Sequence, residues 1–142
     1  MQRGVLCVFG LLSAFWSAGA SSATPDAGPF DGRWGVILVC PKAPDGALPF
    51  TFEFTAAVKD AVLHGEHGVA GQPGWLSLDG RIRPDGAANL EARGLTGHPN
   101  YNINQTAQGV PYEHDVTARF DASRGTGNWV TSRICNFTFG RQ

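Results

Sequence analysis

The sequence predicts an all-β protein, an antiparallel up-and-down barrel of about eight strands. Apolar and polar residues alternate with a period of two, turn signals recur every ~8–12 residues, and no long amphipathic helical stripe occurs. A two-sheet β-sandwich gives similar patterning, so the sandwich is the alternative fold.

The first twenty residues have the pattern of a signal peptide. A short basic segment, 1–3, precedes the apolar run 5–16, and the small residues 18–20 follow as a cleavage site. A second possible site follows Ala23, and a buried N-terminal helix is the alternative interpretation. The run is shorter than the ~20 residues that span a bilayer. We therefore expect a periplasmic or secreted protein.

After residues 1–20 we expect a flexible lead-in over 21–29 and a single β-barrel domain over 30–142. Loss of Arg3 leaves 10 basic residues against 12 acidic ones, a net charge of about −2. Nucleic acids and anionic membranes require a basic surface, so neither is an expected partner. No later apolar segment is long enough to span a membrane.

The alternation is clearest in two segments. Phe50, Phe52 and Phe54 alternate with polar residues, as Tyr112 and His114 do further along the chain. Such strands bury one face and expose the other. The eight predicted strands are 33–40, 49–59, 61–68, 74–83, 87–94, 111–121, 127–133 and 134–141.

Short glycine-containing segments of two to four residues mark the predicted turns. They occur at 44–46, 71–74, 79–80, 84–86 and 125–127. No turn signal separates the last two strands, so a bulge near Arg133 or one long bent strand is equally consistent with the sequence.

Two cysteines remain once Cys7 leaves with the signal peptide. A pair such as Cys40 and Cys135 in an exported protein predicts a disulfide and not a metal site. With these cysteines facing each other on antiparallel strands, the pairs are Leu38 with Phe137, Val36 with Phe139 and Trp34 with Arg141. A slip of one residue would turn both phenylalanines to the other face. First-to-last pairing closes a sheet into a barrel.

The segment Asp31-Gly32-Arg33-Trp34 resembles the Gly-x-Trp that opens the first strand of lipocalins and the wider calycin group. The resemblance implies that Trp34 packs at the closed end of the barrel beneath an arginine near the last strand, the place of Arg141. The chain also resembles small exported proteins of proteobacteria, which implies no activity. That second resemblance is carried by Phe30-Asp-Gly-x-Trp34, Leu78-Asp-Gly-x-Ile82 and Gly94-Leu-Thr-Gly97.

The predicted function is non-enzymatic binding of a small apolar or aromatic ligand inside the barrel. One inward face carries aromatic residues and a histidine. The expected ligand-binding residues are Phe52, Phe54, Tyr112, His114 and Trp129.

The alternative is a protein-binding or inhibitor module that acts through the long connection 95–110. Long connections in compact domains are often binding loops, and this one is rich in amide side chains. The expected partner-contacting residues are Asn100, Tyr101 and Asn102.

No catalytic, cofactor or metal motif stands out. His64 and His67 are three apart in a predicted strand, so they face opposite sides. Ser77, Ser123 and Ser132 lack the Gly-x-Ser-x-Gly context of a nucleophile elbow. We therefore expect neither a cofactor nor a metal ion.

Overall fold

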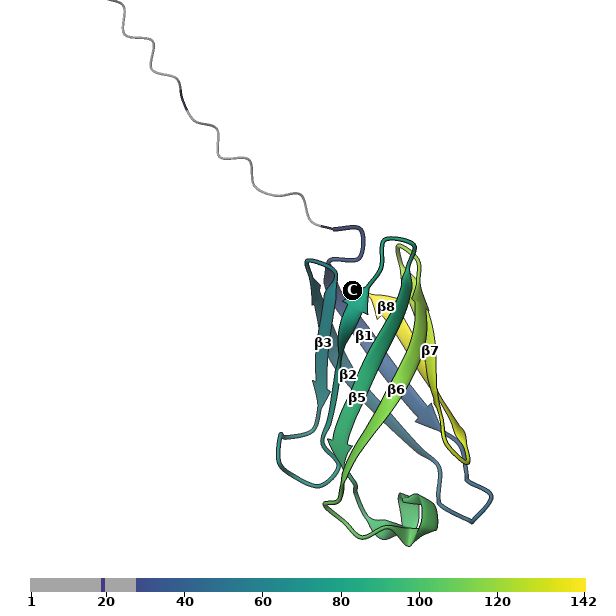
Figure 1. The fold of residues 1–142 in the computed structure, drawn as a ribbon. Coiled ribbons are helices and arrows are strands. Elements are labelled where there is room, and N and C mark those ends of the chain that lie inside the picture. Colours follow the sequence, from purple (N-terminus) through teal and green to yellow (C-terminus); the bar gives the residue numbers. More distant parts are fainter. Residues whose placement is uncertain (1–18, 20–27) are drawn as a thin grey trace, which may run out of the picture.

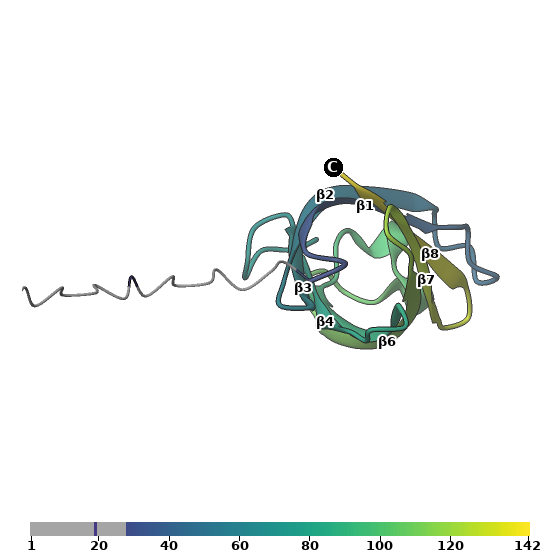
Figure 2. The same cartoon turned by 90° about the horizontal axis from the view of Figure 1, so that it is seen from above.

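The computed structural model describes residue 19 and residues 28–142, and these form a closed barrel of eight antiparallel strands (Figures 1 and 2). Each strand pairs with the next, and β8 pairs with β1, so the predicted up-and-down barrel is confirmed and the sandwich is excluded. The strands are β1 (Gly32–Cys40), β2 (Phe50–Lys59), β3 (Val62–His67), β4 (Leu76–Ile82), β5 (Ala87–Leu95), β6 (Pro111–Phe120), β7 (Arg124–Val130) and β8 (Ile134–Arg141).

Two short 3-10 helices, η1 (Pro99–Tyr101) and η2 (Ile103–Gln105), interrupt the connection between β5 and β6. Neither of these two helices could cross a membrane, and no other helix lies in the described part of the chain. The predicted signal peptide and its cleavage sites lie outside the described residues, apart from Gly19.

The closing ladder has the predicted register. Between β1 and β8 the partners are Trp34 with Arg141, Val36 with Phe139 and Leu38 with Phe137. One step beyond this ladder, Cys40 and Cys135 form the predicted disulfide. Both phenylalanines are buried, so the disulfide and the apolar face specify the same register.

Trp34 organises the closed end of the barrel, which is the upper end in Figure 1. Its indole Nε1 donates a hydrogen bond to the Phe30 carbonyl oxygen at 2.9 Å, and its ring packs edge-on against Phe120. The Arg141 guanidinium lies 4.9 Å from the centre of the Trp34 ring. The arginine-over-tryptophan arrangement that the resemblance implied is therefore present.

Seven of the predicted strand ranges agree with the structure to within two residues, but the seventh strand does not. We predicted a turn at 125–127 and a strand over 127–133, whereas these glycines lie within β7 and the turns lie at 121–123 and 131–133. Asp121 makes the first turn, because its carboxylate accepts the backbone N–H groups of Ser123 and Arg124. The glycines serve packing instead: a Cβ on Gly125 would lie 2.6 Å from the Phe120 ring.

The turn signal at 79–80 is wrong for the same reason. Asp79 and Gly80 lie in the middle of β4, and Gly80 pairs with Leu90 of β5. A Cβ on Gly80 would lie 2.6 Å from the Leu90 side chain. A glycine inside a strand can thus mark close packing against a neighbouring strand as well as a turn.

The packing role of Gly125 has a measurable consequence. We expect Gly125→Ala to lower the free energy of unfolding by ~1–3 kcal/mol, because the buried Phe120 ring must move to admit the methyl group. Gly140→Ala in β8 is the matched control, since no atom lies within 4 Å of a Cβ built there. Urea unfolding of both variants measures the difference. Equal midpoints would show that Gly125 is not needed for packing.

Candidate functional site

The inner face of the barrel changes character along its axis. At the closed end, inward side chains such as Trp34 and Phe139 are fully buried, whereas Phe50, Phe52 and Tyr112 near the other end are only half-buried. A cavity of about 780 Å³ opens at this second end, which we call the mouth. In Figure 1 the mouth is the lower end, and in Figure 2 the 95–110 connection crosses the far opening.

Two ladders stop short of the mouth, so two pairs of neighbouring strands are not paired there. The β6–β7 ladder covers only the four pairs from Thr117–Asn128 to Phe120–Gly125, and the β2–β3 ladder covers only four pairs at the closed end. Where each of these strand pairs is no longer hydrogen-bonded, a histidine ring of one strand contacts an aromatic ring of the other. His67 stacks on Phe52 with ring centres 3.8 Å apart, and His114 lies 4.9 Å from Trp129.

Tyr112, His114 and Trp129 form one aromatic wall of the cavity. Tyr112 and His114 alternate along β6, and their ring centres lie 5.4 Å apart. Tyr112 in turn meets Trp129 edge-on at 6.1 Å. The Tyr112 ring fits because residue 94 is glycine: a Cβ there would lie 2.4 Å from the Tyr112 hydroxyl oxygen.

Burial keeps this wall uncharged. Removal from water lowers the pKa of His114, and nearby Asp115 offsets that effect only in part. Burial also raises the pKa of the Tyr112 hydroxyl well above its usual range. At neutral pH the wall therefore presents a neutral imidazole and a neutral phenol, each able to donate or accept a hydrogen bond.

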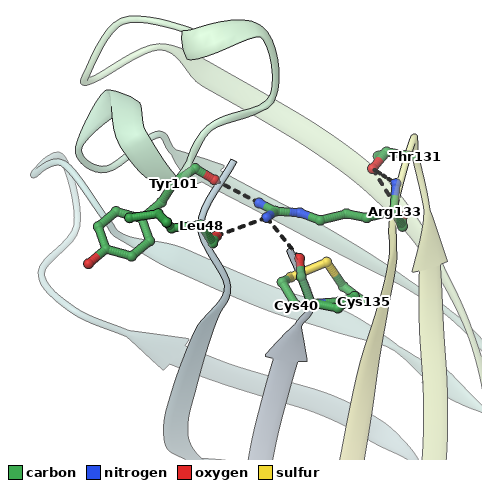
Figure 3. Close-up of a disulfide and its surroundings, with 7 residues drawn as sticks. Cys40, Leu48, Tyr101, Thr131, Arg133 and Cys135 are labelled. Carbon is green, nitrogen blue, oxygen red and sulfur yellow. Dashed lines mark hydrogen bonds between the residues drawn. A yellow bond between two sulfur atoms is a disulfide. The ribbon is translucent and has the colours of Figure 1, made fainter. Parts of the chain in front are cut away.

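Arg133 lies beside the disulfide and holds the mouth segments together (Figure 3). Its Nη1 donates to the carbonyl oxygens of Pro41 and Leu48, both at 3.1 Å, and its Nη2 donates to that of Tyr101 at 2.7 Å. The guanidinium also lies 5.1 Å from the centre of the Phe50 ring. The sequence marks Arg133 only as the site of a possible bulge, because the loop with Pro41 and Leu48 and the connection with Tyr101 both lie far from it in the chain.

The 95–110 connection is a wall of the cavity. The Asn100 carbonyl oxygen accepts the backbone N–H of Leu48 at 2.8 Å, and the backbone N–H of Asn104 donates to the Asp45 carboxylate at 2.6 Å. Within the connection, the Asn102 side chain donates to the Gly97 and Thr106 carbonyls. The bonds to Leu48 and Asp45 tie the connection to the 41–49 loop, and the Asn102 bonds brace the connection internally.

The lowered pKa of Asp45 is a second sign of the contact between the 41–49 loop and the 95–110 connection. The backbone N–H groups of Asn104 and Ala47 donate to its carboxylate and hold its pKa below the usual range. Asp45 was predicted only as part of a turn, and its contact with η2 was not foreseen.

The structure brings most of the predicted site residues together. Phe52, Tyr112, His114 and Trp129 line the cavity, as do Tyr101 and Asn102 from the predicted partner loop. Phe54 and Asn100 are not part of this lining: the Phe54 ring packs against His67, and Asn100 contributes its backbone to the loop tie. The two sets predicted for separate functions therefore share one cavity.

A histidine, an aspartate and a serine meet on the outer face of β3 and β4. The Asp79 carboxylate contacts His64 Nδ1 and accepts the Ser77 hydroxyl, each at 2.5 Å. Aspartate lies between the other two residues, so no histidine is placed to take a proton from the serine. His64 faces outward while His67 faces the barrel interior, as the strand pattern predicted.

Residues 28–142 contain no group of three or more histidine, cysteine or acidic side chains that could hold a metal ion. Comparisons with protein-family models, with curated proteins and with solved structures give no match. The eight-stranded up-and-down barrel is consistent with a lipocalin-like fold. The geometry of the cavity is therefore the basis on which a function can be assigned.

Proposed function

We propose that the protein binds a small apolar or aromatic molecule in the mouth cavity. The observation that carries this proposal is a cavity of about 780 Å³ walled by aromatic side chains that stay half-buried although they face inward. Small-molecule sites typically have volumes of about 300–1,000 Å³. A ligand that covers apolar surface gains ~25 cal/mol per Å² removed from water.

The arrangement along the barrel axis supports entry from the mouth. The large side chains Trp34, Phe137 and Phe139 are fully buried and fill the interior beyond the cavity. The β2–β3 and β6–β7 ladders end before the mouth, so the strands beside Phe52 and Trp129 are not paired at the opening. A ligand would therefore reach the aromatic wall past the 95–110 connection.

We further propose that the protein acts after export, in the periplasm or outside the cell. The signal-peptide pattern and the disulfide support this proposal, because disulfides persist in oxidising compartments. A place among the small exported proteins of proteobacteria is proposed on the motif resemblance alone.

A neutral fluorescent probe tests the binding proposal. We expect N-phenyl-1-naphthylamine to bind the purified protein saturably, with brighter emission and energy transfer from Trp129 in the cavity lining. We expect Phe52→Ala to weaken binding about tenfold, because loss of ~50 Å² of apolar contact costs ~1.4 kcal/mol.

The matched control is Ile37→Ala, which removes an apolar side chain from the outer face of β1, where Ile37 is 42% exposed. This variant should bind the probe as the wild type does. Absence of saturable binding, or equal losses in both variants, would contradict the proposal.

Protein binding through the 95–110 connection is the second candidate. Two large apolar side chains in this segment, Tyr101 at 40% and Val110 at 39%, remain exposed next to the mouth. A partner retained by the immobilised wild type, and lost with Tyr101→Ser/Val110→Ser, would support this candidate. Retention of every captured protein by that double variant would contradict it.

A further inference from the structure

The mouth cavity carries one permanent charge. Arg133 is the only lysine, arginine, aspartate or glutamate in its lining, and the remaining lining residues are apolar, amide, hydroxyl or histidine side chains of the described chain. Arg133 stays protonated in proteins because its guanidinium is a very strong base. A cavity that is otherwise uncharged and contains a single cation favours a ligand with a single negative charge.

Not every N–H group of the Arg133 guanidinium donates a hydrogen bond to the described residues. A guanidinium has five N–H groups, and Arg133 makes three hydrogen bonds, two from Nη1 and one from Nη2. Its Nε–H and the second N–H of Nη2 have no acceptor among the described residues. Two N–H donors on one planar group can together donate hydrogen bonds to the two oxygens of a carboxylate.

The charge of Arg133 also lacks a direct counter-ion. All three of its acceptors are neutral carbonyl oxygens, and it belongs to no ion pair of the described residues. Asp45 supports the charge only at longer range, since its own oxygens are taken by Ala47 and Asn104. Burial to 8% exposure therefore leaves a cation that an anionic ligand would stabilise.

Arg141 at the closed end provides a comparison within the same molecule. It also lies over an aromatic ring and donates to three carbonyl oxygens, but its Nε, Nη1 and Nη2 are all engaged. Arg141 is exposed and is not part of the mouth cavity lining. An arginine that only holds carbonyl oxygens in place can therefore use its Nε–H for this purpose, as Arg141 does. Arg133 differs because its Nε–H has no acceptor among the described residues.

We propose that the cavity takes an amphipathic monocarboxylic acid, with its carboxylate on Arg133 and its apolar or aromatic body against the wall of Tyr112, His114 and Trp129. This inference rests on the proposed function and adds the chemical class of the ligand to it. The planar fork of a guanidinium matches a carboxylate better than a neutral polar group, so the acid should be preferred over its neutral derivatives.

Cis-parinaric acid and its methyl ester form a matched pair of fluorescent probes, because they share one polyene body and differ only in the carboxylate. At pH 7.5 the acid is ionised. We expect the wild-type protein to bind the acid about 10–100-fold more tightly than the ester, the gain typical of a hydrogen bond to a charged group. Titration of both probes gives this acid-to-ester ratio.

Three variants assign the preference to Arg133. We expect Arg133→Gln to bring the ratio close to one, Arg133→Lys to keep part of it because the charge remains, and Arg141→Gln to keep it fully. Circular dichroism and urea unfolding check that each variant is folded. Because the wild-type ratio is measured without any variant, the preference for the acid is tested even if Arg133→Gln misfolds.

The outcomes separate this inference from the proposed function. If neither probe binds the wild type, the proposed function fails and the inference falls with it. If both bind with equal affinity, the cavity binds apolar molecules but the carboxylate assignment is overturned. A preference for the acid that persists in Arg133→Gln also overturns the assignment, because another group must then hold the carboxylate.

Discussion

Replacement of both Cys40 and Cys135 by alanine is expected to lower the free energy of unfolding by ~4–5 kcal/mol. The two cysteines are 95 residues apart, so the disulfide closes nearly the whole barrel into one loop. In the chain-entropy model, cross-linking a loop of ~100 residues lowers the conformational entropy of the unfolded chain and so raises its free energy by ~4.7 kcal/mol. A domain with typical stability of ~5–15 kcal/mol would lose a large part of it.

Denaturant unfolding of the wild type and the double variant, each with and without a thiol reductant, measures this effect. The reductant should destabilise the wild type and leave the double variant unchanged. If the double variant unfolds at the same denaturant concentration as the oxidised wild type, the β1–β8 closure does not depend on the disulfide. The Arg133 clamp would then be the next candidate for holding that edge of the mouth.

Replacement of Trp34 by alanine is expected to cost ~3–5 kcal/mol. Trp34 is fully buried, and truncation of a large aromatic side chain in a core leaves a cavity that the surrounding structure fills only in part. The variant also leaves the Phe30 carbonyl without the indole donor and removes the ring beneath Arg141. The closed end loses packing, a hydrogen bond and a cation–π contact together.

Trp34→Phe separates these contributions, because it keeps an aromatic ring and loses the Nε1–H donor. We expect a smaller loss for this variant, and a loss of only ~0.5–2 kcal/mol for Arg141→Gln if the cation–π contact dominates its role. Thermal and denaturant unfolding measure all three variants. A Trp34→Ala protein as stable as Arg141→Gln would contradict a central packing role for the indole.

Most of the architecture could be predicted because strand geometry is strict. Side chains alternate between two faces, so the phenylalanines of β8 and the cysteine pair specify one register between β1 and β8. The error at β7 shows where this reasoning ends. Glycine has two uses, in turns and in close packing, and only the position of the Phe120 ring decides which one applies to Gly125.

The candidate site was predicted in part. Tyr112 and His114 follow from alternation along β6, but alternation cannot tell how far along the barrel the interior is filled. That depends on where the β2–β3 and β6–β7 ladders stop, and backbone pairing between strands is a property of the whole barrel. Phe54 was therefore predicted for the site and lies outside the cavity lining.

By itself, the sequence determined the all-β class and predicted the closing register and the disulfide, because these follow from period-two patterning and from a single cysteine pair, whereas the structure decided for the barrel over the sandwich. Only the tertiary structure decided that the mouth holds a cavity and that Arg133 supplies its one permanent charge. The physical reason is that Arg133 is held by carbonyl oxygens from two segments that are distant from it in the chain, the 41–49 loop and the 95–110 connection. Backbone carbonyls occur at every residue, so no side-chain pattern marks which of them will converge.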